Sequence, residues 1–280
     1  MPFFSRDNLE FHYLERGRGV PVFFQHGLGG ETEKIFSLLT LPPGFRLLGM
    51  DCRAHGKTKP FGNLENPGFD SMADDLVGLM DHLQIARAVF GGTSMGAGVA
   101  LNCALRYPQR VLGLVLLRPA WLDSPNKANA KLFGFVAGLI REHGPQAASN
   151  VFKQSEPYLA IARDCPDSAA SLLALFLDPR ALETVDRLEL IPQDAPNRDR
   201  SLWRGLAVPT LVMATRADPI HPFEYGQVLA REIPGARFEE LTPKSISLAQ
   251  YTSDLNRSLA DFLLGVPALA GSSSQNSRRH

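Results

Sequence analysis

The amino-acid sequence predicts an α/β fold, in which helices cover both faces of a mostly parallel β-sheet and a helical segment is inserted into the chain. Short apolar runs closed by turn residues alternate with longer segments whose apolar residues recur at helical spacing. This alternation is typical of a parallel sheet with crossover helices. Residues 121–206 break the alternation, because they contain helical segments but no apolar run typical of a buried strand.

Six strands are predicted from the apolar runs, at 20–25, 46–50, 88–91, 111–117, 210–214 and 237–241. Helices are predicted at 69–85, 95–107, 224–233 and 250–264. In the first of these helices the apolar residues form one stripe, as expected for a helix that packs on a sheet. The stripe consists of Met72, Leu76, Leu79, Met80 and Leu83. Within 121–206, helices are predicted at 128–141 and 168–177.

One domain with an insertion accounts for the chain of 280 residues better than two domains do. No linker rich in Pro, Gly or Ser divides its middle, and α/β domains often exceed roughly 200 residues. We therefore predict a core formed by residues 1–120 and 207–266, with the insertion at 121–206. The polar, low-complexity residues 267–280 predict a disordered tail.

The charge and cysteine content exclude several kinds of partner. Lys and Arg total 29, as do Asp and Glu, so the formal net charge is zero. Such a chain lacks a single-sign field to attract nucleic acid or an anionic membrane, and neither partner is predicted. The three cysteines show no ligand spacing, and no P-loop or dinucleotide motif occurs. Neither a metal nor an organic cofactor is therefore predicted.

The N-terminal segment, Met1 to Asp7, lacks the basic region and long apolar core of a secretory signal. No uninterrupted apolar run approaches the roughly 20 residues that span a bilayer. A soluble, cytoplasmic protein is therefore expected.

The segment Gly92-Thr93-Ser94-Met95-Gly96 follows a predicted strand and opens a predicted helix. Gly-x-Ser-x-Gly forms a nucleophile elbow in this setting. The glycines leave room for the strained turn and for the neighbouring chain, and the helix N-terminus favours negative charge that develops near the serine. Ser94 is therefore the predicted nucleophile.

A second Gly-rich segment, His26-Gly27-Leu28-Gly29-Gly30, follows the predicted strand 20–25. Such loops can turn backbone N–H groups toward a reacting carbonyl oxygen. The usual partner is the N–H of the residue that follows the nucleophile. The predicted oxyanion hole therefore consists of the N–H groups of Leu28 and Met95.

In these motifs the chain resembles the α/β-hydrolase fold superfamily. Four segments carry the resemblance, in the family's order and over almost the whole chain: His26-Gly27, the run from Asp51 to Thr58, the Ser94 elbow, and the run from Arg216 to Pro222. The second has alanine and threonine where the family usually has glycine and serine, and it is mainly structural. The resemblance implies an eight-stranded sheet, with 121–206 as a cap that covers the active site and selects the substrate.

In such triads the order along the chain is Ser, then Asp or Glu, then His. Asp218 follows the predicted strand 210–214 and matches the family's acid, which orients and stabilises an imidazolium. The histidine is expected between strand 237–241 and the last helix, near Ser245 or Ile246, but this segment contains none. Neither of these two side chains can take a proton from Ser94 at neutral pH.

Three explanations remain for the base. His221, close after Asp218, could act as a displaced base. Alternatively the base was lost, by drift or by deliberate mutation to trap a ligand, leaving a site that binds substrate and turns it over slowly. In the third explanation another group serves, such as His143 or Tyr158 from the cap, or the reaction is not a hydrolysis.

The combined expectation is a serine hydrolase that cleaves an ester, lactone or related acyl bond through an acyl-enzyme on Ser94. Apolar cap residues such as Phe133, Phe152 and Leu172 favour a small-molecule acyl substrate that is partly hydrophobic. Two alternatives belong to other classes: a non-catalytic binding protein that keeps the pocket, and a carbon–carbon bond hydrolase or lyase on the same fold.

Overall fold

The structure is a computed structural model that describes residues 2–61 and 67–266. Its centre is an eight-stranded sheet with the order β1-β2-β4-β3-β5-β6-β7-β8. The strands are β1 Phe3–Arg6, β2 Leu9–Gly17, β3 Val20–Gln25, β4 Phe45–Met50, β5 Ala88–Thr93, β6 Val111–Leu117, β7 Thr210–Ala214 and β8 Arg237–Glu240. β1 and β2 pair antiparallel, as do β2 and β4, and the remaining pairs are parallel. The predicted α/β fold is confirmed.

The central strands are continuous apolar runs because the sheet is covered on both faces. All residues of β7 are buried, and so are all but one of β3 and of β6. The six predicted strands correspond to β3 through β8; β3, β6 and β7 have the predicted ends, and β4, β5 and β8 differ at one end by one or two residues. The largest difference is at β5, which continues to Thr93, so the first two residues of the elbow are still part of the strand.

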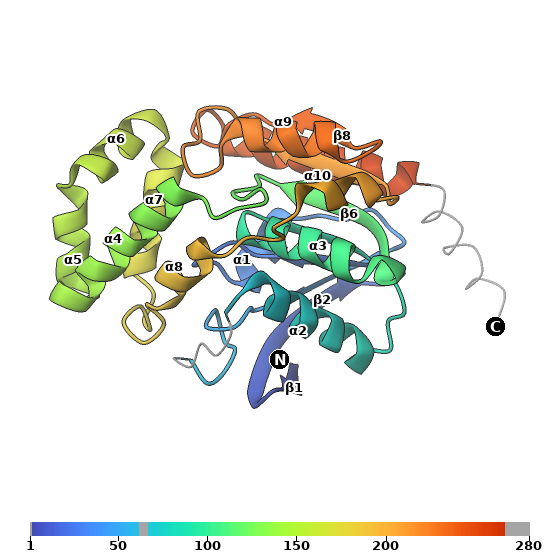
Figure 1. Cartoon of the computed structure of the whole chain (residues 1–280), viewed down its shortest axis with the longest axis horizontal. Coiled ribbons are helices and arrows are strands. Elements are labelled where there is room, and N and C mark those ends of the chain that lie inside the picture. The colour runs from blue at the N-terminus through green and yellow to red at the C-terminus, as the bar shows by residue number, and fades with distance from the viewer. Residues whose placement is uncertain (1, 62–66, 267–280) are drawn as a thin grey trace.

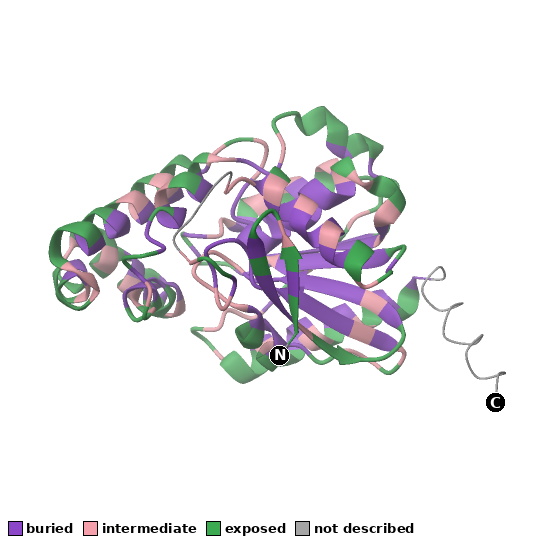
Figure 2. Cartoon of the chain, turned by 90° about the horizontal axis from the view of Figure 1, so that it is seen from below, coloured by how far each residue is buried: buried purple, intermediate pink, exposed green. Residues whose placement is uncertain are grey.

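Helices lie on both faces of this sheet (Figure 1). They are α1 Thr32–Leu38, α2 Phe69–His82, α3 Met95–Arg106, α9 Phe223–Glu232 and α10 Leu248–Gly265. α2, α3 and α9 share one apolar core with the sheet, and α1 and α10 share the other. The strands between them are largely buried (Figure 2). None of the helices within residues 2–61 and 67–266 is long and apolar enough to cross a bilayer.

The chain between β6 and β7 is helical and contains no strand; this part is described throughout. Its helices are α4 Lys127–His143, α5 Pro145–Lys153, α6 Glu156–Asp164, α7 Pro166–Phe176 and α8 Arg187–Leu190. They form a group beside the sheet, at the left of Figure 1, with an apolar core of their own. The domain limits 1–120, 121–206 and 207–266 stay a prediction, and the predicted tail at 267–280 lies outside the described residues.

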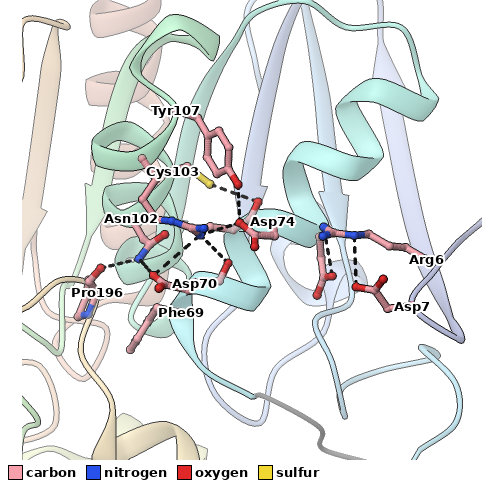
Figure 3. Close-up of polar contacts among 12 residues, drawn as sticks. Arg6, Asp7, Phe69, Asp70, Asp74, Asn102, Cys103, Tyr107 and Pro196 are labelled. Carbon is pink, nitrogen blue, oxygen red and sulfur yellow. Dashed lines mark hydrogen bonds and ion pairs between the residues drawn. The ribbon is translucent and has the colours of Figure 1, made fainter.

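Polar contacts fasten α3, the helix that begins after Ser94, to α2 (Figure 3). Asn102 Nδ2 donates to Asp70 Oδ1 at 2.6 Å and to the Pro196 carbonyl at 2.7 Å. The Tyr107 hydroxyl donates to Asp74 Oδ1 at 2.5 Å. Asn102 is buried, and its amide joins α3 to the exposed Asp70 of α2 and to the buried Pro196 carbonyl. These contacts fix α3 relative to α2 and to the chain that returns from the helical insertion.

We expect Asn102→Ala to lower the free energy of unfolding by about 1–3 kcal/mol, because it leaves the buried Pro196 carbonyl without its donor. Denaturant unfolding followed by circular dichroism measures this. The matched control is Asn150→Ala, at an exposed position, which should change stability by less than about 0.5 kcal/mol. Equal effects of the two substitutions would contradict a structural role for the Asn102 amide.

Candidate active site

Ser94 lies on a sharp turn between β5 and α3. Its backbone angles are φ 57° and ψ −115°, a region that non-glycine residues rarely occupy. A Cβ on Gly92 would lie 2.3 Å from the Gly96 carbonyl oxygen, and one on Gly96 would lie 2.2 Å from the Gln25 carbonyl oxygen. Only glycine fits at both positions. The turn therefore holds Ser94 above the carboxyl ends of the strands, at the N-terminus of α3.

A cavity of about 220 Å³ opens above Ser94. The loops after β3, β7 and β8, the end of β6 and helices α4 and α7 all contribute to its wall. The core side of the wall includes Leu28, Ser94, Arg118, His221 and Lys244, and the helical insertion adds Phe133, Ser171, Leu172 and Leu175. The wall thus combines serine, histidine and cationic side chains with an apolar surface.

Asp218 and His221 form a hydrogen-bonded pair on the loop after β7. His221 Nδ1 lies 2.9 Å from Asp218 Oδ2. The backbone N–H groups of Ile220 and His221 both donate to Asp218 Oδ1 at 3.2 Å, which closes a tight Asx-type turn. Since an ionised carboxylate only accepts, we assign the hydrogen of the imidazole to Nδ1. Nε2 is then left as a proton acceptor.

Arg118 is the second partner of the Asp218 carboxylate. Its Nε donates to Asp218 Oδ2 at 3.0 Å, and one of its terminal amino groups donates to the same oxygen. It stands directly after β6 with a positive φ of 46°. Ser168 of α7 donates its hydroxyl to the other carboxylate oxygen at 3.1 Å. Three parts of the chain therefore converge on one buried carboxylate.

These neighbours set the protonation states of the pair. Burial alone would raise the pKa of Asp218, but the charges of His221 and Arg118 and their hydrogen bonds hold it well below its usual value. Burial lowers the pKa of His221; Asp218 opposes this, and the positive charges of Arg118 and Lys244 add to it. His221 is therefore neutral at pH 7, the form in which an imidazole accepts a proton.

The predicted site residues differ in their relation to the cavity. Leu28 lines it, while Met95 is the buried first residue of α3, where a backbone N–H has no partner within the helix. Ser245 and Ile246 are exposed and do not line it, and 75% of Ile246 is accessible to solvent. The structure thus places no proton acceptor at the position where the family has its histidine.

Two side chains of the helical insertion that are alternative candidates for the base, His143 and Tyr158, also lie outside the wall of this cavity. His143, at the end of α4, is exposed beside Glu142, and Tyr158 packs against the Phe152 ring at a centroid distance of 5.3 Å. Among the residues that line the cavity with Ser94, the two histidines are His26 and His221. His26 Nε2 accepts from the Cys52 N–H at 3.0 Å, and its Nδ1 contacts the Gly27 carbonyl at 2.8 Å. Both ring nitrogens of His26 are engaged in these contacts. Of the two histidines in the wall, His221 is therefore the candidate proton acceptor.

Sequence reasoning missed Arg118 and Lys244. Arg118 directly follows the apolar strand β6, and a charge at the carboxyl end of a buried strand was a usable signal. Lys244 lies in the segment where the family has its histidine, and a lysine is not a base near pH 7 at its usual pKa, so the expectation of a base did not point to it. Both cationic side chains line the cavity.

The described part of the chain contains no group of three or more His, Cys, Asp or Glu side chains that could hold a metal ion. Cys52, Cys103 and Cys165 are buried free thiols.

Comparison with known families assigns the fold. A model of the alpha/beta hydrolase fold family matches residues 20–245. The chain belongs to this family. This α/β hydrolase is 33% identical, over 81% of its length and 86% of the relative's, to a putative carbamate hydrolase RutD of Stutzerimonas stutzeri. It is 28% identical, over 81% of its length and 84% of the relative's, to the AB hydrolase superfamily protein YisY of Bacillus subtilis.

Solved structures agree with this assignment. The enol-lactonase of Burkholderia xenovorans superposes with a TM-score of 0.71 and 25% identity, covering 94% of this α/β hydrolase and 99% of the lactonase. The relatives and structural neighbours of this α/β hydrolase are largely hydrolases, which supports hydrolase activity for it as well.

We expect Arg118→Gln to raise the pKa of His221 by about 1 pH unit, because it removes a buried positive charge that opposes the imidazolium. Titration of the imidazole C–H resonances by NMR measures this shift. The control is Arg200→Gln, which breaks the exposed 2.7 Å contact between Arg200 and Asp123 and should leave His221 unchanged. A His221 pKa that stays the same or falls in the Arg118 variant would contradict this electrostatic role.

Proposed function

We propose that this α/β hydrolase cleaves an ester, lactone or related acyl bond through an acyl-enzyme on Ser94, with His221 as general base and Asp218 as its orienting acid. The observation that carries the proposal is that Ser94 and His221 line one cavity, while His221 Nδ1 is bonded to Asp218. The order of the three residues along the chain is that of the family, although the base comes from an unusual place.

The proposed reaction begins when Ser94 Oγ attacks the acyl carbonyl carbon and its proton passes to His221 Nε2. The imidazolium that forms is stabilised by Asp218, and it returns the proton to the departing alkoxide oxygen as the acyl-enzyme forms. A water molecule then attacks the acyl carbon and gives a proton to His221, and the acid leaves as Ser94 regains its hydrogen. Within the described residues Ser94 Oγ has no hydrogen-bonding partner, and such contacts often tighten only with substrate in place.

The remaining parts of the cavity support an acyl substrate. The backbone N–H of Met95 at the start of α3 and that of Leu28 are the proposed donors to the oxyanion, whose charge the helix N-terminus also stabilises. Apolar cap side chains, among them Phe133, Leu172 and Leu175, form the opposite wall. A short, partly hydrophobic acyl group fits this surface.

We expect a fluorophosphonate probe to label the wild-type protein and not Ser94→Ala, because only an activated serine attacks the phosphorus. Mass spectrometry of the labelled protein measures this. Ser171→Ala is the matched control, since Ser171 lines the same cavity on α7 without standing on a strained turn, and it should label like the wild type. Equal labelling of the wild type and Ser94→Ala would contradict Ser94 as an activated nucleophile and would favour a non-catalytic binding protein.

We expect His221→Ala to lower kcat on short-chain esters by about 10³-fold or more, because no other acceptor replaces the imidazole. Steady-state kinetics measures this, with circular dichroism as the check on folding. Ile246→His should bring no gain in activity, because that position is exposed. If instead His221→Ala retains turnover, or Ile246→His raises it strongly, the base is not His221.

A further inference from the structure

Lys244 occupies the loop between β8 and α10, one residue before the positions where the family's histidine was sought. Its neighbours Ser245 and Ile246 are exposed, whereas Lys244 is half-buried and lines the cavity above Ser94. Its Nζ lies 4.8 Å from the centre of the Tyr251 ring, a buried side chain of α10 that also lines the cavity. The loop therefore places the Lys244 ammonium in the wall of the cavity above Ser94, next to the position where the family has an imidazole.

The other charges of the cavity wall are balanced within the protein. Lys34 Nζ lies 3.8 Å from Glu31, and both line the cavity. Arg118 is paired with Asp218 and lies 3.6 Å from Asp167. No carboxylate of residues 2–61 and 67–266 is within ion-pair distance of Lys244. Among these residues Lys244 thus has no ion-pair partner of its own, and Asp167 and Asp218, which also contact Arg118, only partly offset its positive charge.

The protonation state of Lys244 favours an electrostatic role over a role as base. Burial, and then repulsion from Arg118, lower the pKa of Lys244 to about 8. At pH 7 about nine in ten such groups still carry the proton and cannot accept another. Burial of the ammonium and repulsion from Arg118 are unfavourable, and Asp167 and Asp218 offset this cost only in part. An anion bound beside Lys244 would relieve the remainder.

We propose that Lys244 is an anion-binding residue of the cavity, and that the substrate is a short acyl ester or lactone that carries a carboxylate. This inference rests on the proposed function and names the substrate class for it. The carboxylate lies beside the Lys244 ammonium, the acyl carbonyl lies over Ser94, and the carbon chain between them contacts the apolar cap wall. A cavity of about 220 Å³ suits a short chain with charge at one end.

The test compares two p-nitrophenyl esters of equal size: the monoester of glutaric acid, which carries a carboxylate, and the ester of glutaramic acid, in which a neutral amide replaces it. We expect the kcat/KM of the wild type to be about 10- to 100-fold higher for the anionic ester than for the neutral one, mainly because its KM is lower. In Lys244→Met this selectivity ratio should fall to near 1, and Lys244→Arg should keep most of it. The control is Lys153→Met, an exposed position on α5, which should keep the wild-type ratio.

A binding measurement without turnover separates this inference from the serine mechanism. Calorimetry with monomethyl glutarate should give a Kd at least about tenfold weaker for the Ser94→Ala, Lys244→Met double variant than for Ser94→Ala alone. If the fluorophosphonate fails to label Ser94 but this difference holds, the proposed reaction is wrong and the anion site stands. A wild-type ratio near 1, or an equal loss on both esters in Lys244→Met, overturns the anion site and assigns Lys244 to the reaction itself or to the fold.

Discussion

The buried carboxylate of Asp218 is the contact on which the rest of the site depends. An isolated ionised carboxylate in such a position is very costly, so it must be paired and fully hydrogen-bonded. Here the guanidinium of Arg118, the imidazole of His221, the hydroxyl of Ser168 and two backbone N–H groups supply its partners. Each of these partners is held in place by the carboxylate in return. The orientation of His221, on which the proposed base function rests, is one result of this arrangement.

The same carboxylate couples the helical insertion to the core. Ser168 belongs to α7, whose apolar residues line the cavity, so movement of α7 away from the sheet would remove a hydrogen bond from Asp218. Arg187 strengthens the attachment through its 2.5 Å bond to the Ala54 carbonyl, while Asp178 at 2.7 Å balances its charge. The position of α7 and the electrostatics of Asp218 are therefore linked through short polar contacts.

Much of the fold could be predicted from sequence, because strands buried on both faces appear as apolar runs and the elbow needs glycine at two fixed positions. The predicted α/β class was confirmed, and Ser94 stands on the predicted strand-to-helix turn. The pairing of Arg118 with Asp218 could not be read from the sequence, since these residues are 100 positions apart and meet only through the sheet. The direction of Lys244 depends on the backbone of a loop whose next two side chains turn outward, and no periodicity encodes such a turn.

The proposed position of the base at His221 has a consequence for specificity. In the family's usual arrangement, acid and base come from two loops, and the second loop is occupied by its histidine. Here an Asx-type turn brings His221 back onto Asp218 within one loop, so the loop after β8 no longer has to supply a base. Burial is the main cause that lowers the pKa of His221, and the charges of Arg118 and Lys244 add to it. Lys244 also lines the cavity, where we propose that it binds an anionic group. A lysine in place of a histidine in this loop is thus consistent with both proposals, His221 as the base and a preference for a carboxylate.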